Sequence, residues 1–133
     1  MAPAPAVALL LGRPEFSGDL SLAAAFVKDR RVLLTGAAGS IGTPLAQVLA
    51  HAGPASLTLL DHHEHSLFSL ERALGPAGPT LTYELADVRD RRRLERVLKR
   101  QRPEIVIHLA AAKHVPYGER FPEGAIEANV LAT

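Results

Sequence analysis

Three glycines, at residues 36, 39 and 42, stand between an apolar run and a segment with helical spacing. Gly36 permits a tight exit from a strand, Gly39 lets the backbone approach an anion, and Gly42 lets a helix lie close on a sheet. The amides of Ser40 and Ile41 would point at that anion from the helix start, helped by the helix dipole. Because no lysine follows the last glycine, the turn is not a triphosphate-binding loop of the Walker type. It is a candidate pyrophosphate site, with a tightly packed turn as the plainer alternative.

A carboxylate stands at the end of the next apolar run. Asp61 follows Gly42 by nineteen residues, and at the tip of a second strand it can accept hydrogen bonds from an adenosine ribose. Its charge would repel a 2′-phosphate, so we expect NAD as the cofactor, with NADP possible. The alternative is an ordinary aspartate that caps the following helix. Strand, glycine turn, helix, strand and acid in this order favour dinucleotide binding.

Other polar groups have plainer explanations. The run HHEH at residues 62–65 could suggest a metal site, but consecutive residues at a helix entry point in different directions, and we expect no metal. His108 stands within an apolar strand and is expected to be an interior histidine with its hydrogen bonds satisfied. Between Arg89 and Arg102 there are eight basic and two acidic residues. We expect a solvated helix face there and not a nucleic-acid site, since no aromatic residue is interleaved.

These groups need a frame of alternating strands and helices. Short apolar runs predict strands over residues 32–35, 57–60, 81–85 and 105–109. Helical spacing predicts helices over residues 20–28, 40–52, 65–74, 90–101 and 123–133. The apolar positions that define the helix over 40–52 are Ile41, Leu45, Val48 and Leu49, and those of the first helix are Leu20, Leu22, Ala23 and Phe26. The alternation predicts an α/β Rossmann fold, whose parallel sheet has the order 3-2-1-4 with helices on both faces.

Length and composition set the outer limits. With 133 residues and a net charge of +1, we expect one compact domain that does not work by coating nucleic acid or an anionic membrane. The absence of cysteine excludes disulfides and thiolate chemistry. The apolar run over residues 6–11 is too short to span a bilayer, and no basic residue precedes it, so we expect a cytoplasmic protein. Residues 1–28 are expected to form a lead-in segment with a short helix, and residues 29–133 the Rossmann domain.

Several strings in the chain resemble a known family. They are TGAAGSIG at residues 35–42, LDHHE at 60–64, ADVRD at 86–90, AAAKHVP at 110–116 and NVLAT at 129–133. The first resembles the TGxxGxxG fingerprint of extended short-chain dehydrogenases/reductases. Together they resemble the polysaccharide-biosynthesis (CapD/FlaA-like) branch, which holds nucleotide-sugar 4,6-dehydratases and epimerases. The likeness extends over residues 10–133 and concerns the N-terminal part of such enzymes.

The resemblance implies roles for further residues near the cofactor. By it, Asp87 and Val88 would line the adenine pocket. Ala110, Ala111 and Ala112 would run along the ribose and nicotinamide side, where small side chains let the end of a strand approach a flat ring.

On the substrate side, the resemblance implies that Lys113 and His114 face a sugar-nucleotide cleft and that Asn129 orders the last helix. Such enzymes also carry a catalytic Tyr/Met-x-x-x-Lys pair. Neither Tyr83 nor Tyr117 has lysine four positions later, so we expect no catalytic residue in this chain.

The sequence is therefore expected to be the NAD(P)-binding first half of a nucleotide-sugar dehydratase or epimerase of polysaccharide (capsule, O-antigen or glycan) biosynthesis. The whole enzyme would act on a UDP-sugar, and the chain alone would be inactive. The alternative is a non-catalytic nucleotide-binding or regulatory module of the same fold. An open edge on the fourth strand would leave backbone groups unpaired, so we also expect the isolated chain to self-associate or to be marginally stable.

Overall fold

The computed structural model describes residues 20–75 and 80–133. Its strands are β1 (Arg31–Thr35), β2 (Ser56–Asp61), β3 (Thr80–Leu85) and β4 (Ile105–His108). Its helices are α2 (Leu20–Val27), α3 (Gly42–His51), α4 (Glu64–Leu74), α5 (Arg91–Gln101), α6 (Val115–Arg120) and α7 (Pro122–Ile126), and a π-helical turn, η1 (Glu127–Leu131), follows α7. Of the predicted lead-in segment, residues 1–19 lie outside the described residues.

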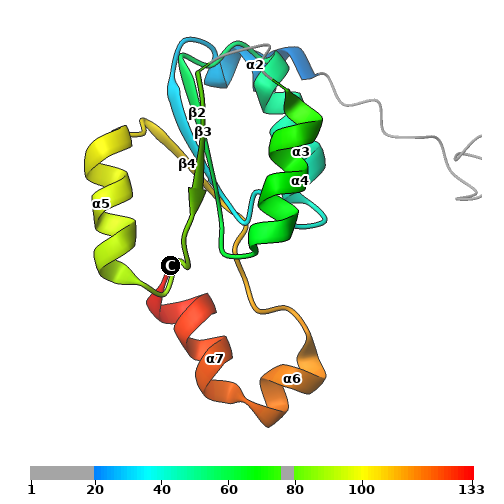
Figure 1. Cartoon of the computed structure of the whole chain (residues 1–133), viewed down its shortest axis with the longest axis vertical. Helices are drawn as coiled ribbons and strands as arrows, with labels where there is room; N and C mark the ends of the chain where they lie inside the picture. The colour runs from blue at the N-terminus through cyan, green and yellow to red at the C-terminus, as the bar shows by residue number, and fades with distance from the viewer. Residues whose placement is uncertain (1–19, 76–79) are drawn as a thin grey trace, which may run out of the picture.

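The sheet has the predicted topology. All four strands are parallel and lie in the order β3-β2-β1-β4. Thr35, the last residue of β1, pairs with Leu60 of β2 on one side and with His108 of β4 on the other. Figure 1 shows α3 and α4 on one face of the sheet, α5 on the other, and α6 and α7 beyond the carboxyl ends of the strands. This arrangement confirms the Rossmann-type α/β fold.

Alternation along the central strand builds one core on each face of the sheet. Val32 and Leu34 belong to the cluster that includes Leu49 of α3 and residues of α4. Leu33, between them, belongs to the opposite cluster with Val97 of α5. Strands of a parallel sheet covered on both faces are expected to be near-continuous apolar runs, and β1 has such a run over its buried residues Val32, Leu33 and Leu34.

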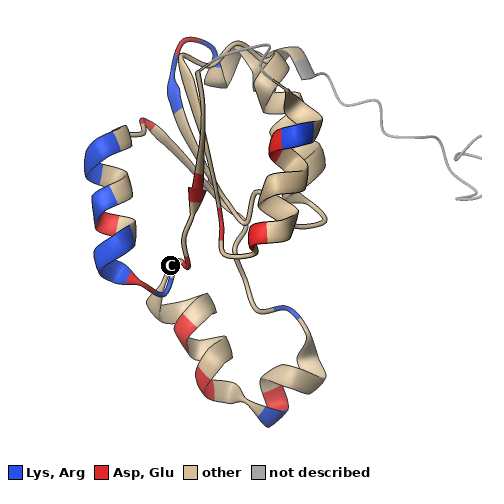
Figure 2. Cartoon of the chain, viewed as in Figure 1, with Lys and Arg blue, Asp and Glu red and all other residues tan. Residues whose placement is uncertain are grey.

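Helix α5 is amphipathic, as its sequence predicts. Asp90 caps its N-terminus, where the carboxylate accepts a hydrogen bond from the backbone N–H of Arg93 at 3.0 Å. Val97 is buried against the sheet, while the basic residues cover the outer surface of the helix (Figure 2). On that surface Arg91 pairs with Glu95 at 3.0 Å.

Helix α3 differs from its prediction in start and in buried face. It begins at Gly42 and not at Ser40, so the glycine turn is longer than expected. Ile41 and Val48 are exposed although helical spacing grouped them with the apolar positions of the helix. The buried residues are Gly42, Ala46, Leu49 and Ala50. Three of these are small residues spaced four apart, and they let the helix approach its neighbours closely. The prediction followed the large apolar residues and therefore missed this face.

The last segment also departs from its prediction. In place of one helix from residue 123, α6 comes first, the chain breaks at Phe121 (φ −134°, ψ 63°), and α7 runs into η1.

Helix α2 forms where predicted, but its apolar residues are not all covered. Leu22 and Phe26 are exposed, and Val27 enters the core in their place. Neither α2 nor any other helix in the described ranges is long and apolar enough to cross a membrane.

Candidate functional site

The glycine turn is shaped by backbone contacts that exclude side chains. Gly36 has φ 66°, and a Cβ on it would lie 2.7 Å from the backbone nitrogen of Ala110. A Cβ on Gly42 would lie 2.0 Å from the carbonyl oxygen of Gly36. Gly36 therefore permits both the left-handed exit from β1 and the close approach of the chain after β4. Gly42 was expected to let the helix lie close on the sheet. In the structure, the atoms that a side chain at Gly42 would meet belong to the glycine turn itself.

Two amides of the turn are left for a ligand. Gly39 donates its N–H to the carbonyl of Gly36 at 3.1 Å, and its own carbonyl accepts from Thr43 at 2.9 Å. Among the described residues, no acceptor lies within hydrogen-bond reach of the amides of Ser40 and Ile41. Both precede α3, whose N-terminus carries a partial positive charge. The turn can therefore bind an anion through these two N–H groups.

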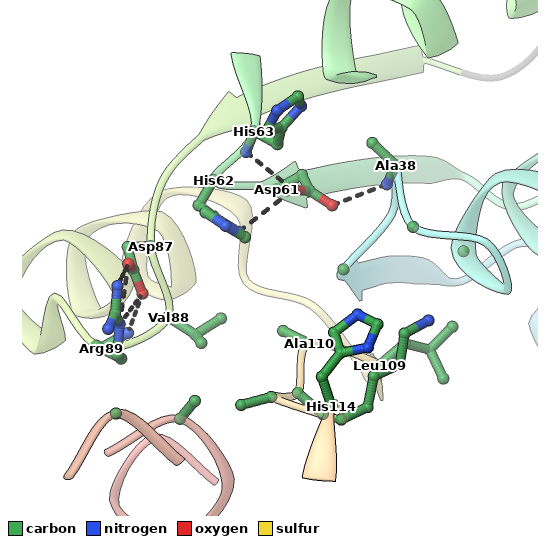
Figure 3. Close-up of a pocket in the computed structure, with 18 of the residues that line it drawn as sticks. Ala38, Asp61, His62, His63, Asp87, Val88, Arg89, Leu109, Ala110 and His114 are labelled. Carbon is green, nitrogen blue, oxygen red and sulfur yellow. Dashed lines mark hydrogen bonds and ion pairs between the residues drawn. The ribbon is translucent and has the colours of Figure 1, made fainter. Parts of the chain in front are cut away.

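Asp61 fastens the turn to the end of β2. One carboxylate oxygen accepts from the N–H of Ala38 at 2.9 Å and the other from the N–H of His63 at 3.0 Å. His62 Nδ1 lies 3.5 Å from the latter oxygen, as Figure 3 shows. Asp61 is only 7% exposed, so its carboxylate is held in place. A carboxylate has about four acceptor positions, and capacity for ligand hydroxyls remains.

Asp61 is not the N-cap of α4, which was the alternative role considered for it; a neighbouring residue takes that role. His63, not Asp61, is the N-cap of α4, and its ring nitrogen accepts from the backbone N–H of Ser66 at 3.3 Å.

Asp87 and Val88 lie in the connection between β3 and α5. The carboxylate of Asp87 accepts from the backbone N–H of Arg89 at 2.9 Å and from its guanidinium at 2.5–3.0 Å. These hydrogen bonds hold the pKa of Asp87 below its usual value. Val88 is buried. The connection thus presents a fixed negative charge beside an apolar side chain.

The chain after β4 forms the opposite wall. Lys113 reaches across to the glycine turn, where Nζ donates to the hydroxyl of Ser40 at 3.0 Å. Asn129 is bound twice to the backbone of Ala112: its side-chain oxygen accepts from the N–H and its amide donates to the carbonyl, both at 2.8 Å. This pair of bonds fixes η1 against the segment that leaves β4.

His108 has the partner that an interior histidine needs. Its Nδ1 lies 2.6 Å from the hydroxyl of Thr35, the last residue of β1. The predicted hydrogen bonding is confirmed, whereas the ring is half-buried and not fully interior.

The walls enclose one cavity of about 860 Å³ at the carboxyl ends of the strands. This size is typical of sites for small molecules and cofactors. The predicted site residues that line it are Gly36, Gly39, Ser40, Ile41, Gly42, Asp61, Asp87, Val88, Ala110, Ala111, Ala112, Lys113 and His114. Asn129 does not line the cavity; it contacts the site only through its two hydrogen bonds to the backbone of Ala112.

Sequence reasoning missed several residues of the cavity. Ala38, His62, His63 and Ser66 lie next to the predicted turn and acid, and Arg89 lies inside a quoted motif. Tyr117 and Phe121 come from α6 and its end, an element the sequence analysis did not expect. In residues 20–75 and 80–133, no group of three or more acidic or histidine side chains is placed to hold a metal ion.

Comparison with known proteins gives a consistent result. A family model described as "Polysaccharide biosynthesis protein" matches residues 32–133. The probable polysaccharide biosynthesis protein EpsC of Bacillus subtilis is 38% identical over 127 residues, which are 93% of this chain and 21% of EpsC. A UDP-N-acetylglucosamine 4,6-dehydratase (inverting) of Campylobacter jejuni is 31% identical over 102 residues, or 76% of this chain and 29% of the dehydratase.

A solved structure matches in three dimensions as well. The UDP-glucose 4-epimerase of Stenotrophomonas maltophila, with bound NAD and formylated UDP-arabinopyranose, superposes with a TM-score of 0.65 at 25% identity. The match covers 77% of this chain and 31% of the epimerase. The chain thus spans only about a fifth to a third of the length of these proteins.

Proposed function

The chain belongs to the polysaccharide biosynthesis protein family, whose model matches residues 32–133, and we propose that it is the NAD-binding part of a nucleotide-sugar dehydratase or epimerase. The observation that carries the proposal is the glycine turn, where no hydrogen bond among the described residues engages the amides of Ser40 and Ile41 and where both residues line the cavity together with Asp61. The relatives named as dehydratase and epimerase favour this function over a non-catalytic module.

The residues present fit a dinucleotide. The amides of Ser40 and Ile41 would bind the pyrophosphate, in a turn whose shape depends on Gly36 and Gly42, where a Cβ would collide with backbone atoms. Asp61 would accept hydrogen bonds from the adenosine ribose, and Asp87 and Val88 would line the adenine. When bound, the nicotinamide supplies the site with a hydride acceptor and donor.

Lys113 and His114 would face the UDP-sugar in the whole protein. Lys113 is held beside the turn by its hydrogen bond to Ser40, which would place a positive charge next to a bound diphosphate. The Tyr/Met-x-x-x-Lys pair is not in this sequence, so the chain alone is proposed to bind the cofactor without converting a sugar. Action in the cytoplasm remains a prediction from the sequence.

NAD is the proposed cofactor because the side chain of Asp61 is held in place and cannot rotate away from a 2′-phosphate on the adenosine ribose. Two backbone N–H groups hold the carboxylate, and a 2′-phosphate on the ribose would meet that fixed charge in a buried position. Isothermal titration with NAD and with NADP tests this proposal. We expect NAD to bind at least about tenfold more tightly, and Asp61→Asn to reduce that preference, while Glu119→Gln on exposed α6 leaves it unchanged. Equal binding of the two cofactors by the folded wild-type chain would contradict the proposal.

A further inference from the structure

The positive charge of this chain is concentrated on one helix. Residues 89–102 hold eight basic and two acidic residues, a balance of +6, and the rest of the chain holds seven basic and twelve acidic residues, a balance of −5. Figure 2 shows the basic residues gathered along α5. The net charge of +1, from which no contact with an anionic membrane was expected, is therefore the average of two regions of opposite sign.

Most of the cations around α5 have no anionic partner. Arg89, Arg91 and Arg100 each form an ion pair with a carboxylate. The other basic residues of this stretch are exposed, and no carboxylate of residues 20–75 or 80–133 pairs with them; we call them the basic face of α5: Arg92, Arg93, Arg96, Lys99 and Arg102. Like charges gathered at a surface repel one another, so an anionic partner is favoured there.

The opposite side of α5 is occupied by the core. Val97 is buried, and Leu94 and Leu98 pack against the same cluster. The cations that face directly away from it are spaced four and three apart, as residues on one side of a helix are: Arg92, Arg96 and Lys99. Because its apolar side faces the sheet, α5 cannot insert into a bilayer as an interfacial helix does. A contact made by this face is electrostatic and depends on salt.

The shape and composition of the basic face favour a flat anionic partner over nucleic acid. Helix α5 has 11 residues, so its cations cover a convex surface about 16 Å long. No aromatic residue occurs within residues 89–102, so nothing there can stack on a nucleic-acid base. Groups of about four to eight basic residues on a helix are typical of contacts with anionic lipid headgroups, and a guanidinium can bind a phosphate through two N–H groups.

We propose that the basic face of α5 docks this chain on the anionic surface of a membrane, through lipid phosphates and without insertion. The negative balance of the remaining chain orients the contact, because the same membrane repels the other surfaces. Helices α3 and α4, on the opposite face of the sheet (Figure 1), then point away from the membrane. The inference goes beyond the proposed function and does not depend on it, since no residue of the basic face lines the cavity.

The test is flotation of the chain with unilamellar vesicles in a density gradient, in which self-associated protein without lipid stays at the bottom. The vesicles are phosphatidylcholine alone or phosphatidylcholine with about 30% phosphatidylglycerol, at about 0.1 M and about 0.5 M salt. The first variant removes three charges from the basic face: Arg92→Gln, Arg96→Gln and Lys99→Gln. The matched control removes three charges from exposed positions elsewhere: Lys28→Gln, Arg72→Gln and Arg120→Gln. Circular dichroism melting checks that each variant is folded.

We expect the wild-type chain to float with the anionic vesicles at the lower salt and not with the neutral ones, and to be released at the higher salt by screening. The triple variant of α5 should bind anionic vesicles at least about thirtyfold more weakly, because each cation near the surface contributes about fivefold in affinity. The control should stay within about threefold of the wild type, because its charges lie away from the contact. If the triple variant does not fold, the double variant Arg96→Gln and Lys99→Gln carries the test, with an expected loss of about tenfold.

Three results would overturn the inference. One is a folded wild-type chain that floats equally with both kinds of vesicle, or with neither. Another is an equal loss of binding in the two triple variants, which would make net charge the cause and not the basic face of α5. The third is single-stranded RNA that displaces the chain from anionic vesicles at equal phosphate concentration, which would assign the face to nucleic acid. NAD binding should be the same in the wild type and the α5 variant, so failure of this inference is distinguishable from failure of the proposed function.

Discussion

Gly42 is the residue at which the site tolerates a side chain least. A Cβ there would lie 2.0 Å from the carbonyl oxygen of Gly36 and 2.7 Å from that of Ala37. Both neighbours are backbone atoms, so relief requires the turn to move away from α3. That movement would also displace the amides of Ser40 and Ile41.

Gly42→Ala is accordingly expected to lower the free energy of unfolding by about 2–3 kcal/mol, in the range of substitutions that force a packed backbone to shift. Urea unfolding followed by circular dichroism measures the change. Gly124→Ala is the control, since nothing lies within 4 Å of its added Cβ, and it should leave stability unchanged or raise it by up to about 1 kcal/mol, because Gly124 lies in helix α7 and alanine favours helix. An equal effect of the two substitutions would show that the close contact at Gly42 is unimportant.

The ion pair at Asp87 predicts a dependence of stability on pH. Its hydrogen bonds to Arg89 lower the pKa of Asp87 in the folded chain, so the pair stabilises the fold above the ordinary pKa of 3.8. This contribution is lost as the pH falls through the lower, folded-state pKa.

Asp87→Asn should therefore destabilise the chain at pH 7 by up to about 1 kcal/mol, because the pair is partly exposed. The difference from wild type should shrink in unfolding experiments near pH 3. Glu119→Gln, at an exposed position on α6, should show no such change with pH. A constant difference for Asp87→Asn at both pH values would argue against the ion pair.

Local motifs were sufficient to predict much of the cavity wall. The glycine turn and Asp61 occupy fixed places in a βαβ unit, so their positions in space follow from their order in the chain. Arg89 and Phe121 could not be found this way, because their presence in the wall depends on side-chain contacts and on an unpredicted helix end.

At the scale of elements, the segment from α6 to η1 is held to the sheet by few polar contacts. The two hydrogen bonds between Asn129 and Ala112, each of 2.8 Å, are the clearest of them. They join a π-helical turn to the chain that leaves β4 and forms one wall of the cavity.

Asn129→Ala is expected to loosen this segment by about 1–2 kcal/mol, since two hydrogen bonds are lost at once. Hydrogen exchange should show faster exchange over residues 122–131, with little change in the central strands. The neighbouring Val130→Ala is the control, because Val130 is 65% exposed. Unchanged exchange in the Asn129 variant would mean that other contacts hold η1.

The sheet was predictable because its strands are short, apolar runs separated by turn residues, and crossover handedness then fixes their order. The buried face of α3 was not predictable in this way, because Ala46 and Ala50 are buried for their small size, which lets the helix pack closely, and not for a large apolar side chain. The last predicted helix began at residue 123, close to the observed start of α7 at Pro122, but α6, which precedes the break at Phe121, was not predicted.

At the scale of the molecule, β4 is paired on one side only. It binds β1, and in the described part of the chain no strand pairs with its other edge. Val106 on this strand is exposed, as are Tyr117, Phe121, Ile126 and Leu131 in the segment that follows. An open edge beside apolar side chains is a surface that promotes association.

The isolated chain is therefore proposed to self-associate, and sedimentation velocity over a range of concentrations tests this. Val106→Lys should shift the distribution towards monomer, because a lysine on an edge strand opposes pairing. Leu22→Lys, on exposed α2, should have a smaller effect. A wild-type chain that stays monomeric at all concentrations would contradict the prediction.

The central claim is that a dinucleotide binds where the glycine turn meets Asp61. The most direct measurement is a titration of the 15N-labelled chain with NAD, followed by amide chemical shifts. We predict saturable changes that are largest at Ser40, Ile41 and Ala38, with those of α2 unaffected. A folded chain whose spectrum does not change with NAD, or changes chiefly outside the cavity, would contradict the account.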